Sequence, residues 1–141
     1  GDIIKVDASL VQELLDKGYI PVLSSIASGY DDDVSYNINA DLAAEKIAIA
    51  LKAEKFILLT NVSGVMEDIE DPESLIPSIQ VSKVRSLEKE GIISGGMIPK
   101  VQCCVEAVRQ GIHSANIQDG RIPHSILIEL FSDQGVGTMF Y

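Results

Sequence analysis

The chain has 141 residues, 46% of them hydrophobic and 23% charged, which is long enough to bury a core and typical of a soluble globular domain. Its formal net charge of −10 argues against a general nucleic-acid surface, because phosphate backbones require a basic patch. No apolar run approaches the length of a membrane span and no signal peptide is visible, so we expect a cytoplasmic protein without a membrane or nucleic-acid partner. The sequence starts with Gly1, which predicts a removed N-terminus or a fragment.

Strands and helices are predicted to alternate through the first half of the chain. The segment after Lys55 is nearly all apolar, as strands buried on both faces are. Asn39 is a suitable cap for the helix before it. In chain order, we expect a helix that begins near Asp7 or Ser9 and ends at Gly18, a buried strand at 19–26, an acidic loop or hairpin tip at 28–36, a helix from Asn39 to Leu51, and a strand at 55–60.

The second half continues the alternation. Apolar residues recur at helical spacing from Val101 to Val108, and Gly111 can end that helix. Strands that alternate with helices in this way form crossover units, which predict an α/β fold with a mostly parallel central sheet and helices on both faces. The elements expected here are an acidic solvated turn at 67–73, a helix around 82–90, the helix that follows Pro99, a strand at 114–118, a turn at 119–120, a helix near 123–131 and a strand at 137–141.

The two cysteines, Cys103 and Cys104, are adjacent, so a bridge between them is not expected and there is no disulfide framework. Cys104 lies on the apolar stripe of its predicted helix and is assigned to the core, while Cys103 is interpreted as incidental. No cysteine or histidine pair has the spacing of a metal site, and His113 and His124 are interpreted as surface residues. The sequence therefore predicts no metal held by protein ligands and a reducing compartment.

A glycine-rich bend at 91–96 leads into a helix whose first turn carries Lys100. Free backbone N–H groups, the positive end of the helix dipole and an ammonium together suit a phosphate group. Taken alone, the segment is equally compatible with a Gly-Gly loop before a surface helix. No Walker sequence, Gly-x-Gly-x-x-Gly motif or Gly-x-Ser-x-Gly motif is present, so the common nucleotide and hydrolase fingerprints are absent.

Two further loops are expected beside the glycine bend, at the carboxyl ends of the strands where ligands bind in such sheets. In the loop at 35–41, Asn37 and Asp41 lie four residues apart around a helix start and can address one opening; as an alternative, Asn39 and Asp41 are capping residues only. In the loop at 60–66, small residues and Gly64 allow a close approach to a base or ribose; the alternative is a plain exit from the strand.

Four motifs resemble the acetylglutamate kinases of the amino acid kinase family, in the order and spacing of the C-terminal half of those enzymes. This resemblance implies that the chain, 1–141, is a single α/β nucleotide-binding domain whose N-terminal, substrate-binding half is absent. Such a fragment is expected to have no appreciable activity alone and to expose a sheet edge that favours self-association. The motifs are Tyr36–Asp41, Leu58–Val65, Ile93–Lys100 and Asp119–His124.

The resemblance implies ATP-dependent phosphorylation of the γ-carboxylate of N-acetyl-L-glutamate in arginine biosynthesis, with Mg²⁺ bound with the nucleotide. It assigns Lys100 to the transferring phosphoryl group, Asp41 to the organisation of catalytic lysines and Asn37 to acetylglutamate. The family usually has aspartate where this chain has Asn61. The nucleotide-binding residues implied are Asn61, Val62, Ser63, Gly64, Val65, Met66, Ile92, Ile93 and Ser94.

The end of the chain resembles the arginine-inhibited members of these kinases. That likeness implies that Glu129 and Gly135 line an effector site for arginine, and that the full-length protein forms a homo-oligomer. An acidic side chain suits a guanidinium, although Glu129 as a solvated helix residue and Gly135 as a turn remain the alternative. Other interpretations left open are another amino acid kinase, acting on glutamate, aspartate or carbamate, and a non-catalytic module that senses arginine or nucleotide.

Overall fold

A four-stranded sheet lies at the centre of the structure, a computed structural model in which residues 2–133 and 135–141 are described. Its strand order is β3 (Lys55–Thr60), β5 (Ser114–Asp119), β6 (Gly137–Phe140) and β4 (Ser78–Ile79). β3 and β5 are parallel, as are β4 and β6, while β5 and β6 are antiparallel. The predicted α/β fold with a mostly parallel sheet is confirmed.

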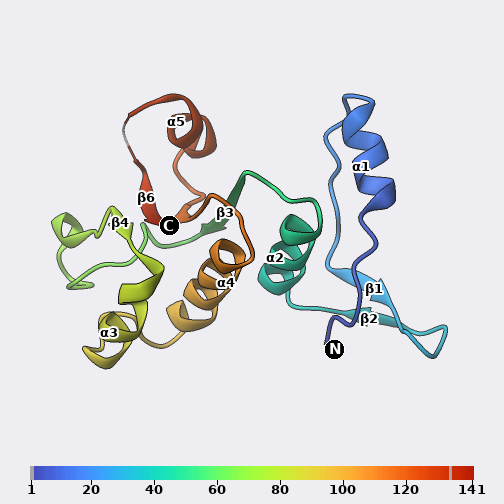
Figure 1. The fold of residues 1–141 in the computed structure, drawn as a ribbon. Coiled ribbons are helices and arrows are strands. Elements are labelled where there is room, and N and C mark those ends of the chain that lie inside the picture. Colours follow the sequence, from blue (N-terminus) through green and yellow to red (C-terminus); the bar gives the residue numbers. More distant parts are fainter. Residues whose placement is uncertain (1, 134) are drawn as a thin grey trace.

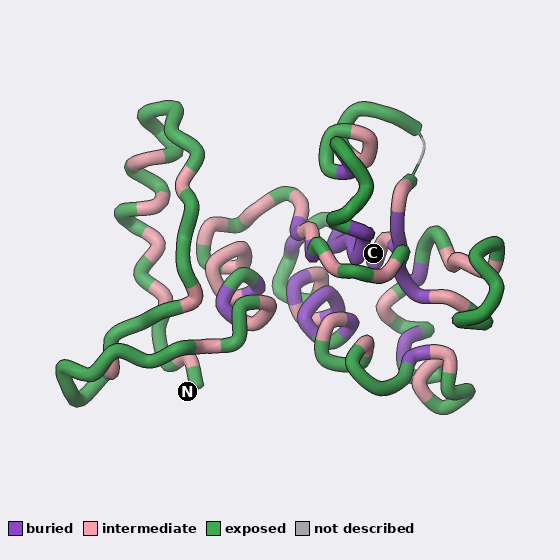
Figure 2. The backbone as a smooth tube through the Cα atoms, turned by 180° about the vertical axis from the view of Figure 1, so that it is seen from behind, coloured by how far each residue is buried: buried purple, intermediate pink, exposed green. Residues whose placement is uncertain are grey.

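Helices cover both faces of this sheet (Figure 1). α2 (Ala40–Ala50) and α4 (Met97–Arg109) pack side by side on one face, and α5 (Ser125–Phe131) lies on the other. α4 supplies Val101, Cys104 and Ala107 to the core, all fully buried, and β5 is buried along its whole length (Figure 2). The assignment of Cys104 to the core is confirmed, and Cys103 is buried as well.

The predicted helix boundaries follow local signals. The Asn39 side chain accepts a hydrogen bond of 3.0 Å from the N–H of Leu42 and caps α2. Gly111, at φ +102, follows the end of α4 in a conformation that glycine adopts readily. Between β3 and α4 the chain forms the short helices η1 (Pro72–Ser74), η2 (Val81–Lys83) and α3 (Val84–Lys89), so the solvated turn and the helix expected there are both present.

The N-terminal part contains α1 (Ser9–Asp16) and an antiparallel hairpin of β1 (Ile26–Ser28) and β2 (Ser35–Asn37). The predicted hairpin tip is confirmed, but the buried strand expected at 19–26 is wrong. Only Ile26 of that segment belongs to a strand, and Ile20 and Val22 are 90% and 95% exposed. Because a strand requires a hydrogen-bonded neighbour, an apolar run beside no partner strand stays extended and open to solvent.

None of the helices in the described residues is long and apolar enough to cross a membrane.

Candidate functional site

The carboxyl ends of β3 and β5 and the amino ends of α2 and α4 lie at one edge of the sheet. α2 leads into β3 and α4 leads into β5 through short connections that reverse the chain direction. The two strands are parallel and in register, with Thr60 opposite Asp119. Ligands of open α/β sheets bind at this position, which we call the carboxyl edge.

Asp41 and Lys100 are in contact at the carboxyl edge. Lys100 Nζ donates a hydrogen bond of 2.6 Å to Asp41 Oδ2, and the two side chains are 27% and 28% exposed. Each residue lies in the first turn of its helix, where the dipole disfavours an ammonium and favours a carboxylate. Asp41 therefore offsets the cost of placing Lys100 there and fixes the direction in which the ammonium points.

The amides that precede Lys100 are available to a ligand. Gly95 has φ +53, and the turn is closed by two bonds, from Met97 N to Ser94 O and from Ile98 N to Gly95 O. Within the described residues, the N–H groups of Gly95 and Gly96 donate to no carbonyl or side chain. A Cβ at either glycine would meet nothing within 4 Å, so the space beside these two glycines is open. Such amides at a helix start suit an anion.

The loop after β3 is held by β6. The buried N–H of Val65 donates to Thr138 Oγ1 at 2.8 Å, and Thr138 Oγ1 in turn donates to Ile76 O at 2.7 Å. Gly64 is buried at φ +154, and a Cβ there would lie 2.5 Å from Thr138 Oγ1, so this position requires glycine. Asn61 and Ser63 remain exposed.

The other predicted site segments differ in burial. Ile93 is buried at 1% exposure beneath the bend that leads to α4, while Ser94 is exposed. Ile92 N and Ile93 N both donate to Leu87 O, which fixes the bend to α3. Asn37 is the last residue of β2 and is exposed three positions before α2 begins. His113 and His124 are exposed, in agreement with the interpretation of both as surface residues.

Glu129 belongs to a second cluster, on the face of the sheet that α5 covers. Its Oε1 accepts hydrogen bonds from Lys55 Nζ at 2.6 Å and from Asn116 Nδ2 at 2.8 Å, and its side chain is only 8% exposed. The interpretation of Glu129 as a solvated helix residue is therefore wrong. Gly135 is exposed beyond α5, with nothing within 4 Å of a Cβ built on it. The sequence did not identify Lys55 or Asn116 as partners of Glu129, because residues so distant in the chain leave no local signal.

Glu45 is a buried acid that the sequence analysis missed. It lies one helical turn after Asp41 on α2, is 3% exposed, and forms an ion pair of 2.9 Å with Lys46. Burial raises the pKa of the Cys103 thiol to about 12, and a hydrogen bond to Glu45 and the nearby negative charges add to that effect. The helical spacing of Asp41 and Glu45 was the available signal. Because its thiol stays protonated near neutral pH, Cys103 is unsuited to nucleophilic chemistry.

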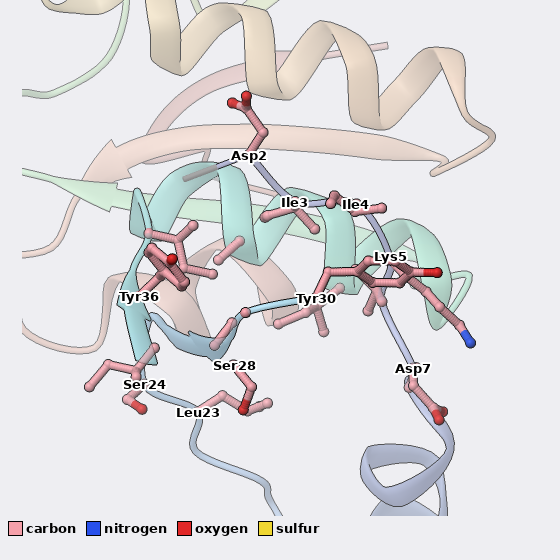
Figure 3. Close-up of a pocket in the computed structure, with 18 of the residues that line it drawn as sticks. Asp2, Ile3, Ile4, Lys5, Asp7, Leu23, Ser24, Ser28, Tyr30 and Tyr36 are labelled. Carbon is pink, nitrogen blue, oxygen red and sulfur yellow. The ribbon is translucent and has the colours of Figure 1, made fainter. Parts of the chain in front are cut away.

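Two cavities flank α2. One, of about 410 Å³, lies between α2 and α4 and is lined by Asp41 and Glu45. The other, of about 620 Å³, lies between the N-terminal segment, the β1–β2 hairpin and α2, and it contains none of the predicted site residues. Figure 3 shows Ile3, Ile4 and Tyr36 around this mostly apolar space.

Comparison with known proteins places these features in context. The family model described as the amino acid kinase family matches residues 1–119. The chain is 55% identical to acetylglutamate kinase of Clostridium beijerinckii, over 100% of this chain and 50% of that protein. It is also 55% identical to acetylglutamate kinase of Heliobacterium modesticaldum, over 99% of this chain and 47% of that protein. The chain thus spans about half the length of the curated relatives it matches.

Solved structures give a consistent picture of the fold. N-acetylglutamate synthase from Neisseria gonorrhoeae, complexed with coenzyme A and L-arginine, aligns with a TM-score of 0.84 at 26% identity, over 96% of this chain and 31% of that one. Isopentenyl phosphate kinase from T. acidophilum aligns with a TM-score of 0.67 at 17% identity, over 100% of this chain and 56% of that one, which shows the fold alone.

Proposed function

Because the chain belongs to the amino acid kinase family, we propose that it forms the nucleotide-binding half of an acetylglutamate kinase. That enzyme transfers the γ-phosphoryl group of ATP to the γ-carboxylate of N-acetyl-L-glutamate in arginine biosynthesis. The observation that carries the proposal is the contact between Lys100 and Asp41 at the carboxyl edge, beside open amides. Identity of 55% to two acetylglutamate kinases supports this choice over glutamate, aspartate or carbamate kinases.

In this proposal, the chemistry of the chain is positioning and charge stabilisation. The acceptor carboxylate is already ionised at neutral pH, so the reaction requires no general base. The Lys100 ammonium stabilises the charge on the transferring phosphoryl group, and Asp41 holds that ammonium in place. The amides of Gly95 and Gly96 complete an anion-binding surface, and Asn37 binds the acetylglutamate.

The nucleotide lies along the two segments 61–66 and 92–94 in this proposal. Asn61 and Ser63 offer exposed polar groups, while Gly64 and Ile93 are buried and fix the backbone on which those groups are carried. In the described residues, no group of three His, Cys, Asp or Glu side chains could hold a metal ion. In this proposal, the Mg²⁺ that accompanies ATP is bound together with the nucleotide phosphates.

The remaining parts of the proposal concern the whole protein. Residues 1–141 act as one nucleotide-binding domain, and the substrate-binding half lies in the part of the relatives that this chain does not match. The chain alone then has little or no kinase activity. The complete enzyme is a cytoplasmic homo-oligomer whose partners are ATP and N-acetyl-L-glutamate.

A regulatory role for the second cluster is a further part of the proposal. Glu129 is nearly buried and is already oriented by Lys55 and Asn116, so an incoming guanidinium meets a fixed carboxylate. Gly135, beside it, leaves room for the ligand. The Neisseria gonorrhoeae synthase has been solved with L-arginine bound, and its fold is similar. We propose that arginine binds here as an inhibitor.

Thermal unfolding of this chain with each ligand tests the proposal. A ligand that binds only the native state at ten times its dissociation constant adds about 1.4 kcal/mol, a shift of several degrees. We expect stabilisation by MgATP in the wild type and a smaller shift in Lys100→Ala, with Lys17→Ala, at the exposed residue directly after α1, as the matched control. Stabilisation by arginine without any response to MgATP would instead favour a non-catalytic sensor.

A further inference from the structure

The turn that follows β5 holds an arginine in a fixed position. Arg121 donates from Nε to Asp119 Oδ1 at 2.9 Å and from Nη2 to Asp119 Oδ2 at 2.8 Å, a bidentate pair. Its backbone N–H also donates to Asp119 Oδ1, at 2.9 Å. The Asp119 side chain is 9% exposed, whereas that of Arg121 is 69% exposed. The guanidinium is thus oriented by a nearly buried carboxylate and faces solvent.

This turn lies at the carboxyl edge, beside the loop at 61–66. Gly120 N donates to Thr60 O at 2.8 Å, directly before that loop begins. The loop then reaches Thr138 through Val65. Since β5 lies between β3 and β6 in the sheet, residues 61–64 must pass the end of β5, where Asp119 and Arg121 are placed. Figure 1 shows the chain after β3 running towards β4, which lies at the opposite edge of the sheet.

The contacts of Arg121 limit what it can bind. The edge formed by Nε and Nη2 is occupied by Asp119, so this edge cannot form a bidentate pair with a phosphate group. The Arg121 side chain is 69% exposed, so much of the guanidinium surface is open to a ligand. A planar guanidinium stacks well on aromatic rings. The geometry favours a planar aromatic group over an anion.

We propose that Arg121 is a further nucleotide-binding residue, whose guanidinium plane stacks on the base of ATP. The proposal rests on the nucleotide site proposed above and adds a residue that lies outside the segments 61–66 and 92–94. Asp119 acts as a positioning residue, since it holds the plane at a fixed angle beside the loop.

Arg121→Lys tests this idea, because lysine retains the charge and the ion pair with Asp119 but removes the plane. The dissociation constants of MgATP and MgCTP are measured by NMR titration of this chain, since CTP carries the same ribose triphosphate with a smaller base. We expect Arg121→Lys to weaken ATP binding roughly three- to tenfold and CTP binding by less. Arg109→Lys, at the far end of α4, is the matched control and should change neither constant.

Three results would overturn the inference. Unchanged ATP affinity in Arg121→Lys would remove the stacking role while leaving the proposed nucleotide site intact. An equal loss for ATP and CTP would indicate a contact to the ribose or the phosphates instead. No ATP binding by the wild type would remove the proposed nucleotide site and this inference together. Circular dichroism of each variant shows whether the fold is retained.

Discussion

The hydroxyl of Thr138 offers the sharpest test of how the loop at 61–66 is held. Thr138 is completely buried, and its Oγ1 accepts from Val65 N at 2.8 Å while donating to Ile76 O at 2.7 Å. Thr138→Val keeps the shape of the side chain but removes both hydrogen bonds. The Val65 N–H and the Ile76 carbonyl then lose their partner.

The expected loss of stability follows from those two groups. Each polar group left without a partner in the interior costs about 1–3 kcal/mol, so Thr138→Val should lose roughly 2–6 kcal/mol of the free energy of unfolding. Folded domains have only about 5–15 kcal/mol in total. With a urea m value of about 2 kcal/mol/M, the unfolding midpoint should fall by roughly 1–3 M.

Urea unfolding followed by circular dichroism measures this change. Thr138→Ser is the matched control, because it retains the hydroxyl and loses one methyl group, worth about 1 kcal/mol. If Thr138→Val unfolds at the same urea concentration as Thr138→Ser, or at a higher one, the hydroxyl does not anchor the loop and the reasoning fails.

Four further predictions concern the edge of the sheet, the cysteines and the N-terminal segment. In the complete kinase, Lys100→Ala should lower turnover about 10²–10³-fold, far more than it weakens nucleotide binding, and equal losses in both would contradict its assigned role. The hydrogen bond from Arg121 lowers the pKa of Asp119 to about 2. The ionised Asp119 carboxylate therefore stabilises the fold above about pH 4, and this stabilisation is lost as the pH falls towards 2. The urea midpoint of Asp119→Asn should fall less steeply between about pH 4 and pH 2 than that of the wild type. Cys103, with its raised pKa, should react with a thiol reagent at pH 8 at least tenfold more slowly in the native protein than in urea, and equal rates would show that it is accessible. The exposed segment at 19–25 should make the chain self-associate, so Val22→Lys should shift sedimentation towards the monomer.

Much of the sheet and its helices could be predicted because their signals are local. The apolar run at 56–59 becomes the middle of β3, and the spacing of Val101, Cys104 and Val108 becomes the inner face of α4. Asn39 marks the start of α2 because its side chain supplies the capping hydrogen bond, and Gly111 marks the end of α4 because glycine readily adopts a positive φ. β4 was missed because it has only two residues and pairs solely with β6.

The strand wrongly predicted at 19–26 shows what local sequence signals cannot predict. Its residues have strand propensity, but a strand exists only when a neighbour supplies hydrogen bonds, and that neighbour is not encoded within the segment. Within this segment, Ile26 alone has a neighbouring strand, where it pairs with Asn37 in the hairpin. Glu129 in α5 likewise depends on residues distant in the chain, because its partners Lys55 and Asn116 lie in β3 and β5. No pattern around Glu129 distinguishes a nearly buried acid from a solvated one.

The carboxyl edge combines both kinds of information. The segments that carry Asp41 and Lys100 were expected to lie side by side because each forms a recognisable helix start, and parallel connections bring helix starts to one edge. Thr138 carries no such mark, since it is one residue of a short apolar strand, although it fixes the loop at 61–66 through two hydrogen bonds. The residues of the proposed site lie in loops and first helical turns with a distinctive composition, whereas Thr138, which holds the loop at 61–66, lies in a strand. A sequence therefore indicates the first group more readily than the second, and the structure is required for the second.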